Sequence, residues 1–167
     1  MSKEIKIQRE TLTSELYDKM LPLGQESWDE CSEIKAETCA FHGKRGFVIE
    51  PDKEHYLHLE DCEAMVALTA RDEEGTLVGF ALCVLYMSPH HSPVLCGNVD
   101  TFYIKPGYRV CMRRFISTIE SELYEAGVTV MGWPTSPSGK MYDILKLLGY
   151  SPDDVIMEKI ISPVEEE

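Results

Sequence analysis

The sequence gathers positive charge in one segment that has the form of an anion site. Residues 105–119 contain no Asp or Glu and four cations, which are Lys105, Arg109, Arg113 and Arg114. The segment follows a strand-like stretch ending at Ile104, turns at Pro106-Gly107 and becomes helical near Val110. Helix N-termini carry unpaired N–H groups and a partial positive charge, and they bind phosphate. The pattern predicts a phosphate-binding turn, with arginines that lie in solvent or pair with distant carboxylates as the alternative.

The rest of the chain is strongly acidic. Its 167 residues are 44% hydrophobic and 27% charged, as in ordinary globular domains, but 29 Asp and Glu against 16 Lys and Arg leave a net charge of −13. With +4 in residues 105–119, the remainder carries −17. Non-specific binding to nucleic acid or to an anionic membrane is therefore disfavoured, because that affinity comes from Lys and Arg. The field favours cations, basic proteins or amines.

We expect the protein in a reducing cytoplasm, because the sequence shows no targeting signal and no cysteine pairs with disulfide or zinc-site spacing. The longest apolar run, residues 78–87, is about half the length that a membrane-spanning helix needs. The charged N-terminus leads into no apolar segment, so we expect no secretory signal. The six cysteines form no CxxC pair, which argues against zinc ribbons, and we expect free, buried thiols rather than disulfides.

The hydrophobic pattern predicts one mixed α+β domain over residues 1–162, followed by a short acidic tail at 163–167. Period-two stretches predict strands at residues 5–7, 64–70, 76–87, 94–104, 128–133 and 155–161. Helical spacing predicts a helix that opens at 11–14 and is interrupted at Pro22 and Gly24, a second at 27–41, a third from Val110 to Gly127 and a fourth over 141–148.

Three stretches of the sequence resemble the GNAT superfamily of acyl-CoA N-acyltransferases. Residues 100–109, DTFYIKPGYR, look like the family's signature strand running into Pro-x-Tyr-Arg. Residues 72–80, DEEGTLVGF, resemble its central hairpin, and LLGY at 147–150 with the strand ending at 161 resembles its C-terminal part. The resemblance covers roughly residues 64–161 and is most similar to GNAT-like proteins of tailed bacteriophages.

The resemblance implies a GNAT-like α/β fold with a mostly antiparallel, twisted sheet of about six or seven strands. The sheet would be splayed between its fourth and fifth strands and flanked by about four helices. The implied activity is transfer of an acetyl group from acetyl-CoA to a primary amine of a small molecule or a protein.

The resemblance also implies which residues bind coenzyme A. The pantetheine arm and acyl group would be lined by Phe102, Tyr103 and Ile104. The pyrophosphate loop would consist of Arg109, Val110, Cys111, Met112, Arg113 and Arg114. This chain has Met112 and Arg114 where the family motif has glycine or alanine. The arginines would either replace amide contacts with charge-assisted ones or fill the site.

Amine acylation needs a general base, a polarised carbonyl and an acid for the leaving thiolate. Asp100 is the best candidate base, with a structural hydrogen bond as the alternative. The position of the family's acidic tyrosine is Leu145 here. Tyr142, one helical turn earlier, is the candidate substitute, and an ordinary amphipathic tyrosine is the alternative. Backbone N–H groups near residues 102–104 could polarise the carbonyl.

No metal site is predicted. His55 and His58 stand among carboxylates, but with no helix predicted there we expect surface histidines. The acidic residues of the N-terminal helices are either a solvated face or the selector of a cationic acceptor, and they are Asp18, Glu26, Asp29, Glu30, Glu33 and Glu37.

Two other functional classes remain open. One is a catalytically inactive GNAT-fold protein, a phage accessory or virion-associated factor that binds a basic partner through its acidic surface. The other is transfer of a different group to a nucleobase, which the charge of −13 disfavours. A homodimer is also left open.

Overall fold

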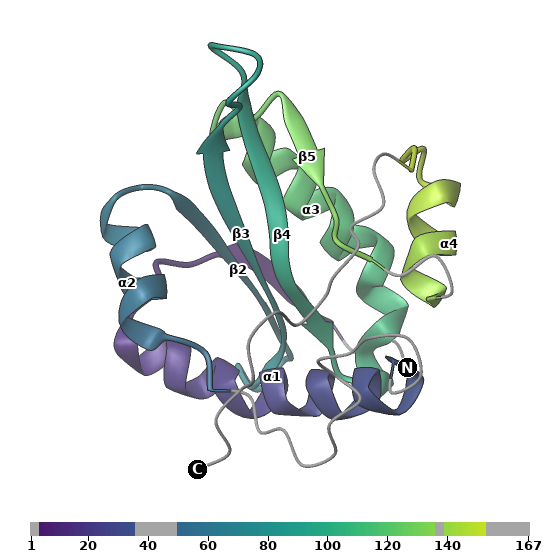
Figure 1. The fold of residues 1–167 in the computed structure, drawn as a ribbon. Helices are drawn as coiled ribbons and strands as arrows, with labels where there is room; N and C mark the ends of the chain where they lie inside the picture. Colours follow the sequence, from purple (N-terminus) through teal and green to yellow (C-terminus); the bar gives the residue numbers. More distant parts are fainter. Residues whose placement is uncertain (1–3, 36–49, 136–138, 153–167) are drawn as a thin grey trace, which may run out of the picture. The chain divides into compact units, whose positions relative to one another are not determined.

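The computed structural model describes residues 4–35, 50–135 and 139–152 (Figure 1). The chain divides into two compact units: a sheet unit of residues 1–25 and 50–134, and a second unit of residues 26–49 and 135–167. The prediction of one domain over residues 1–162 stays a prediction. The strand predicted at 155–161 and the acidic tail lie outside the described residues.

The sheet has five strands in the order β1-β2-β3-β4-β5, among the residues that the structure describes. They are β1 (Lys6–Arg9), β2 (Met65–Arg71), β3 (Leu77–Met87), β4 (Leu95–Ile104) and β5 (Val130–Gly132). The first four strands are antiparallel to their neighbours, and β5 pairs with β4 in parallel. The predicted fold class, a mostly antiparallel GNAT-like sheet with helices around it, is confirmed.

Each face of this sheet carries its own apolar core. On one face, α3 (Met112–Glu125) buries Phe115, Ile119 and Leu123 against strand residues such as Val66 and Leu68. This helix begins directly after a 3₁₀ helix, η1 (Pro106–Cys111). It ends before Gly127, whose φ of +86° is the left-handed conformation that favours glycine at a helix end. The predicted amphipathic helix is therefore confirmed.

Helices α1 (Ser14–Lys35) and α2 (Lys53–Asp61) supply side chains to the core on the other face. The predicted interruption at Pro22 and Gly24 is wrong, because α1 continues through both residues. Met20 and Leu23, on either side of Pro22, are buried in the same cluster. Burial of both side chains outweighs the missing hydrogen bond and the steric cost that Pro22 brings to a helix interior.

Helix α2 was not expected from the sequence. Its first turn is capped by Asp52, whose carboxylate accepts a hydrogen bond of 3.0 Å from the His55 N–H. An aspartate at the N-cap satisfies one of the free N–H groups of the first turn. A short helix with polar ends is thus stabilised by a cap and by the packing of Tyr56, Leu57 and Leu59 on the sheet.

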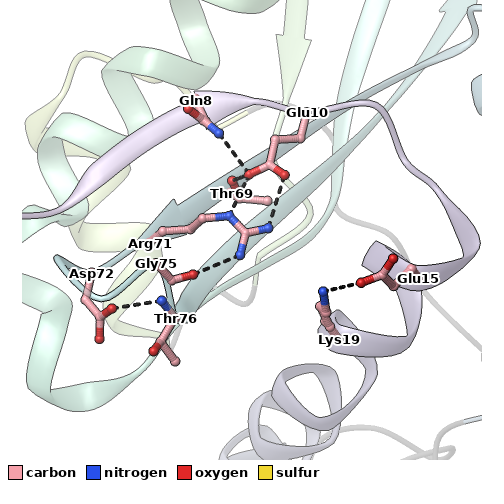
Figure 2. Close-up of polar contacts among 9 residues, drawn as sticks. All are labelled: Gln8, Glu10, Glu15, Lys19, Thr69, Arg71, Asp72, Gly75 and Thr76. Carbon is pink, nitrogen blue, oxygen red and sulfur yellow. Dashed lines mark hydrogen bonds and ion pairs between the residues drawn. The ribbon is translucent and has the colours of Figure 1, made fainter.

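Figure 2 shows the polar network that ties the end of β1 to the β2–β3 hairpin. The Arg71 guanidinium donates to both carboxylate oxygens of Glu10, at 2.8 and 3.1 Å, and to the Gly75 carbonyl at 3.1 Å. Thr69 and Gln8 donate to the same carboxylate. The hydrogen bond from Arg71 is the main cause that lowers the pKa of Glu10 to about 2. Glu10 therefore remains ionised throughout the neutral and mildly acidic range.

The second unit contains the C-terminal part of α1 and the helix α4 (Lys140–Leu147). Leu145 is buried, and Gly149 ends the helix region with a φ of +95°. The predicted fourth helix and its glycine stop are confirmed.

Candidate active site

Strands β4 and β5 run together for only a short distance. Their parallel pairing covers Cys96↔Val130, Gly97↔Met131 and Asn98↔Gly132 and then ends. Strand β4 continues past this point to Ile104, as Figure 1 shows. The structure therefore has the predicted divergence between the fourth and fifth strands.

Asp100 lies at a bulge in β4, just beyond the point where β5 ends. Leu82 pairs with Thr101 and Cys83 with Val99, so Asp100 is an extra residue opposite β3. Bulges re-aim side chains, and they are frequent next to active sites. The Asp100 carboxylate accepts hydrogen bonds from the Tyr56 hydroxyl at 2.6 Å and from the Thr101 hydroxyl at 3.1 Å. The predicted base is thus exposed, and its carboxylate is held in place by two hydroxyl donors.

Tyr56 is the site residue that the sequence reasoning missed. Its ring packs with the α1 and α2 core, 5.9 Å from the ring of Tyr17. Burial, and then the hydrogen bond to Asp100, raise the pKa of Tyr56 above its ordinary value. The phenol therefore stays protonated and serves as a donor to Asp100. The signal that could have found it is the Asp52 cap, which predicts a helix with Tyr56 on its inner side.

The three residues predicted to line the cofactor arm face opposite sides of the sheet. Tyr103 is buried in the α1 and α2 core, whereas Ile104 is buried in the α3 core. Phe102 is partly buried on the α3 side, where its ring centroid lies 5.3 Å from that of Phe115 and 5.2 Å from that of Trp133. Contact of Tyr103 and Ile104 with an arm along β4 would therefore involve their backbone groups.

The predicted pyrophosphate loop spans the end of η1 and the first turn of α3. Two of its arginines donate to backbone carbonyls: Arg109 to Ile104 at 3.2 Å, and Arg114 to Ile5. Arg113 is exposed and makes no hydrogen bond or ion pair with any residue that the structure describes. Arg113 is therefore the loop arginine that is available to an anion.

Met112 and Arg114, which stand where the family motif has glycine or alanine, contact other parts of the protein. Met112 packs against the α3 core, and Arg114 reaches the Ile5 carbonyl. Of the two residues between Arg109 and Met112, Val110 is 87% exposed and Cys111 is buried. Burial raises the pKa of the Cys111 thiol, which disfavours its reactive thiolate form. The side chains of Met112 and Arg114 thus both make contacts within the protein.

The predicted acid Tyr142 and the acidic residues predicted to select the acceptor lie on other elements than β4. Tyr142 belongs to α4 in the second unit, where the ammonium of Lys146 lies 5.5 Å from its ring centroid. Asp18 pairs with Lys53 at 2.5 Å. Glu26, Asp29 and Glu30 belong to the second unit, the side chain of Glu33 is not described and Glu37 lies outside the described residues.

A metal site and a ligand-binding hollow are two further site types. His55 and His58 are exposed on α2, and the described residues contain no group of three or more His, Cys, Asp or Glu able to hold a metal ion. A hollow of about 350 Å³ lies beside Glu10 and Arg71, but its charged side chains pair with each other, as Figure 2 shows for Glu15 and Lys19. Of the helices described, none is long and apolar enough to span a bilayer.

Comparisons with known proteins support the fold. No protein-family model and no curated protein matches the sequence. One similar solved structure is that of an aminoglycoside acetyltransferase, meta-AAC0020 from an uncultured soil metagenomic sample, in complex with sisomicin. Its TM-score is 0.70 and its sequence identity is 13%, over 95% of this chain and 96% of that one. A ribosomal-protein-alanine N-acetyltransferase from Brucella melitensis biovar Abortus 2308 is similar with a TM-score of 0.60 and 20% identity, over 96% and 100%.

A third solved structure is AAC(6')-Iy in complex with the bisubstrate analogue CoA-S-monomethyl-acetylneamine. It matches with a TM-score of 0.64 and 14% identity, over 95% of this chain and 99% of that one. At these identities the likeness concerns the fold. The chain therefore has the fold of these acetyltransferases.

Proposed function

We propose that the protein is an N-acetyltransferase that transfers an acetyl group from acetyl-CoA to a primary amine. The observation that carries the proposal is the Asp100 carboxylate, placed by a bulge at the divergence of β4 and β5 and held by Tyr56 at 2.6 Å. Support also comes from the fold, since one similar structure holds a bisubstrate analogue that contains CoA.

In this proposal, Asp100 takes a proton from the acceptor ammonium, directly or through a water molecule, and leaves a neutral amine as nucleophile. Tyr56 holds the carboxylate in one orientation and keeps its own proton. Acetyl-CoA supplies an activated acetyl thioester. Tyr142 stays the candidate acid for the leaving thiolate.

The binding of the acyl donor is assigned to β4 and to the loop that follows it. Backbone groups of residues 102–104 would border the arm, and Arg113 would contact the phosphates through charge-assisted hydrogen bonds. Arg109 and Arg114 would keep the loop in shape through the backbone carbonyls that they already contact. The three arginines thereby divide between two roles, with Arg113 in contact with the phosphates and the other two in support of the loop.

The acceptor would be a cationic amine, on a small molecule or a protein. The net charge of −13 raises the local concentration of cations near the surface. A cytoplasmic location and a phage origin belong to the same proposal and rest on the sequence motifs alone.

The test combines calorimetric titration of acetyl-CoA with thiol release against a panel of aminoglycosides, polyamines and peptides. Asp100→Asn should lower kcat by about 10²- to 10⁴-fold, the usual contribution of a general base, and leave the Kd for acetyl-CoA unchanged. Asp61→Asn, which removes an exposed carboxylate of α2, is the matched control and should change neither value. Failure of the wild-type protein to bind acetyl-CoA at millimolar concentration contradicts the proposal.

Tyr56→Phe tests the second member of the pair. The substitution keeps the ring and removes the donor to Asp100, so kcat should fall roughly 10-fold, as expected for a lost hydrogen bond to a charged group. The KM for acetyl-CoA should stay the same. Tyr17→Phe is the control, because the Tyr17 hydroxyl donates to the Pro51 carbonyl and not to Asp100. An unchanged kcat in Tyr56→Phe would remove Tyr56 from the mechanism.

A second candidate is a non-catalytic protein of this fold that binds a basic partner. The observation in its favour is that Arg109 and Arg114 both contact backbone carbonyls of their own chain. It predicts no binding of acetyl-CoA and salt-sensitive retention of basic proteins, so the same titration separates the two candidates.

A further inference from the structure

The residue that follows β5 carries a buried polar group without a partner. The indole Nε1 of Trp133 is inaccessible to solvent and makes no hydrogen bond with the residues that the structure describes. An indole nitrogen is a donor only, and leaving such a donor unsatisfied costs about 1–3 kcal/mol. Almost all buried polar groups in proteins have partners, so this one requires an explanation.

Trp133 is held where strands β4 and β5 diverge. It follows Gly132, the last residue of β5 to pair with β4. Its ring meets that of Phe102 on β4 nearly edge-on, at 5.2 Å between centroids, and Phe102 contacts Phe115 of α3 in the same way. The three rings form one apolar cluster with the α3 core. The indole is therefore fixed beside the part of β4 that β5 does not cover.

We propose that the Trp133 indole N–H donates a hydrogen bond to a carbonyl oxygen of the acyl donor. This inference rests on the proposed function and adds a specific contact to it. The acyl donor has two kinds of carbonyl, the amides of its pantetheine arm and its thioester, and both are uncharged acceptors. The aromatic surroundings of Trp133 favour a neutral acceptor over phosphate, because burial of a charge without a countercharge is far more costly.

The decisive variant is Trp133→Phe, which keeps an aromatic ring against Phe102 and removes the donor. The Kd for acetyl-CoA, measured by calorimetry, should rise roughly 5- to 30-fold, the effect of one lost neutral hydrogen bond that leaves a carbonyl unsatisfied. Trp28→Phe removes the chain's other tryptophan and should leave the Kd unchanged. The thermal midpoint of ligand-free Trp133→Phe should not fall, since the substitution eliminates an unsatisfied donor.

Two further measurements sharpen the assignment. In Trp28→Phe protein, Trp133 is the single fluorophore of its type, and saturation with acetyl-CoA should shift its emission. Titration with CoA as well as acetyl-CoA identifies the acceptor. An equal loss of affinity for both ligands assigns the arm amides, and a loss confined to acetyl-CoA assigns the thioester carbonyl.

The outcomes separate this inference from the proposed function. Wild-type protein that binds and uses acetyl-CoA, together with Trp133→Phe protein that binds it equally well, overturns the inference and leaves the function standing. A lowered thermal midpoint with unchanged affinity gives the indole a packing role and also overturns the inference. Absence of acetyl-CoA binding by the wild type overturns both.

Discussion

At the scale of single residues, the function of a carboxylate depends on partners that lie far away in the sequence. Asp100 on β4 and Tyr56 on α2 are 44 positions apart, and the Tyr56 hydroxyl donates to the Asp100 carboxylate. Glu10 and Arg71 are 61 positions apart and form the second such pair. Asp100 of the first pair is exposed, whereas the second pair is partly buried and Glu10 accepts from Arg71, Thr69 and Gln8, which indicates a structural role.

The Glu10 pair leads to a prediction about acid stability. The folded pKa of Glu10 is about 2, below the ordinary 4.5, so the ion pair stabilises the fold fully above pH 4.5 and loses this effect as the pH falls from 4.5 toward 2. Glu10→Gln should lower the free energy of unfolding at pH 7 by about 1–2 kcal/mol, because Arg71 loses its charged acceptor. The difference from wild type should shrink through that acidic window.

Denaturant unfolding at a series of pH values measures this difference. Glu15→Gln is the matched control, since Glu15 and Lys19 form an exposed pair that Figure 2 shows beside the network. Exposed pairs contribute little, so this control should follow the wild-type curve. A Glu10→Gln curve that coincides with the control would contradict the structural role.

At the scale of elements, close contact between strands positions the site. Strand β3 approaches β4 at Gly79, which pairs with Ile104. A Cβ atom added at Gly79 would lie 2.7 Å from the Tyr103 carbonyl oxygen and 3.3 Å from the Ile104 Cα. The end of β4, which leads into the predicted cofactor loop, is therefore held by a contact that only glycine permits.

Gly79→Ala should push β4 away from β3 and lower the free energy of unfolding by about 1–3 kcal/mol, the usual cost of overpacking. Gly107→Ala is the control, because nothing lies within 4 Å of the added Cβ and its φ is not in the left-handed region. Thermal unfolding of both variants measures the effect. Equal midpoints for the two would show that β3 and β4 can separate without cost.

At the scale of the whole molecule, charge is distributed unevenly. The chain carries −13, but residues 105–119, which include the proposed cofactor loop, carry +4. Screening limits surface attraction to about 8 Å at physiological salt, so a single arginine next to a phosphate outweighs distant carboxylates. An anionic donor and a cationic acceptor can therefore bind the same acidic protein.

The net negative charge predicts how salt affects the KM for the acceptor amine. Raising the ionic strength from about 20 to about 300 mM should raise the KM for a cationic amine several-fold, because screening weakens the attraction of the acidic surface. The KM for an aromatic amine that is neutral at the assay pH should change little. Steady-state kinetics with both amines measures the contrast. Equal salt dependence for the two would show that the surface charge does not select the acceptor.

The sequence by itself determined the order of the five described strands and of helices α3 and α4. Alternation predicted strands β1 to β5, and helical spacing predicted α3 and its glycine stop at Gly127, because these signals depend on neighbours along the chain. It also selected Asp100 as a candidate base through a resemblance at residues 100–109. The arginines of the predicted phosphate loop were likewise visible as a local cluster.

Only the tertiary structure decided which of these groups act together. It carried α1 through Pro22, because packing on both sides of the proline outweighed a local helix breaker. It brought Tyr56 to Asp100, tied Arg109 and Arg114 to backbone carbonyls and left Arg113 exposed. It also buried the Trp133 indole N–H without an acceptor among the residues that the structure describes. Each of these outcomes depends on contacts between segments distant in the chain, and local periodicity carries no information about such contacts.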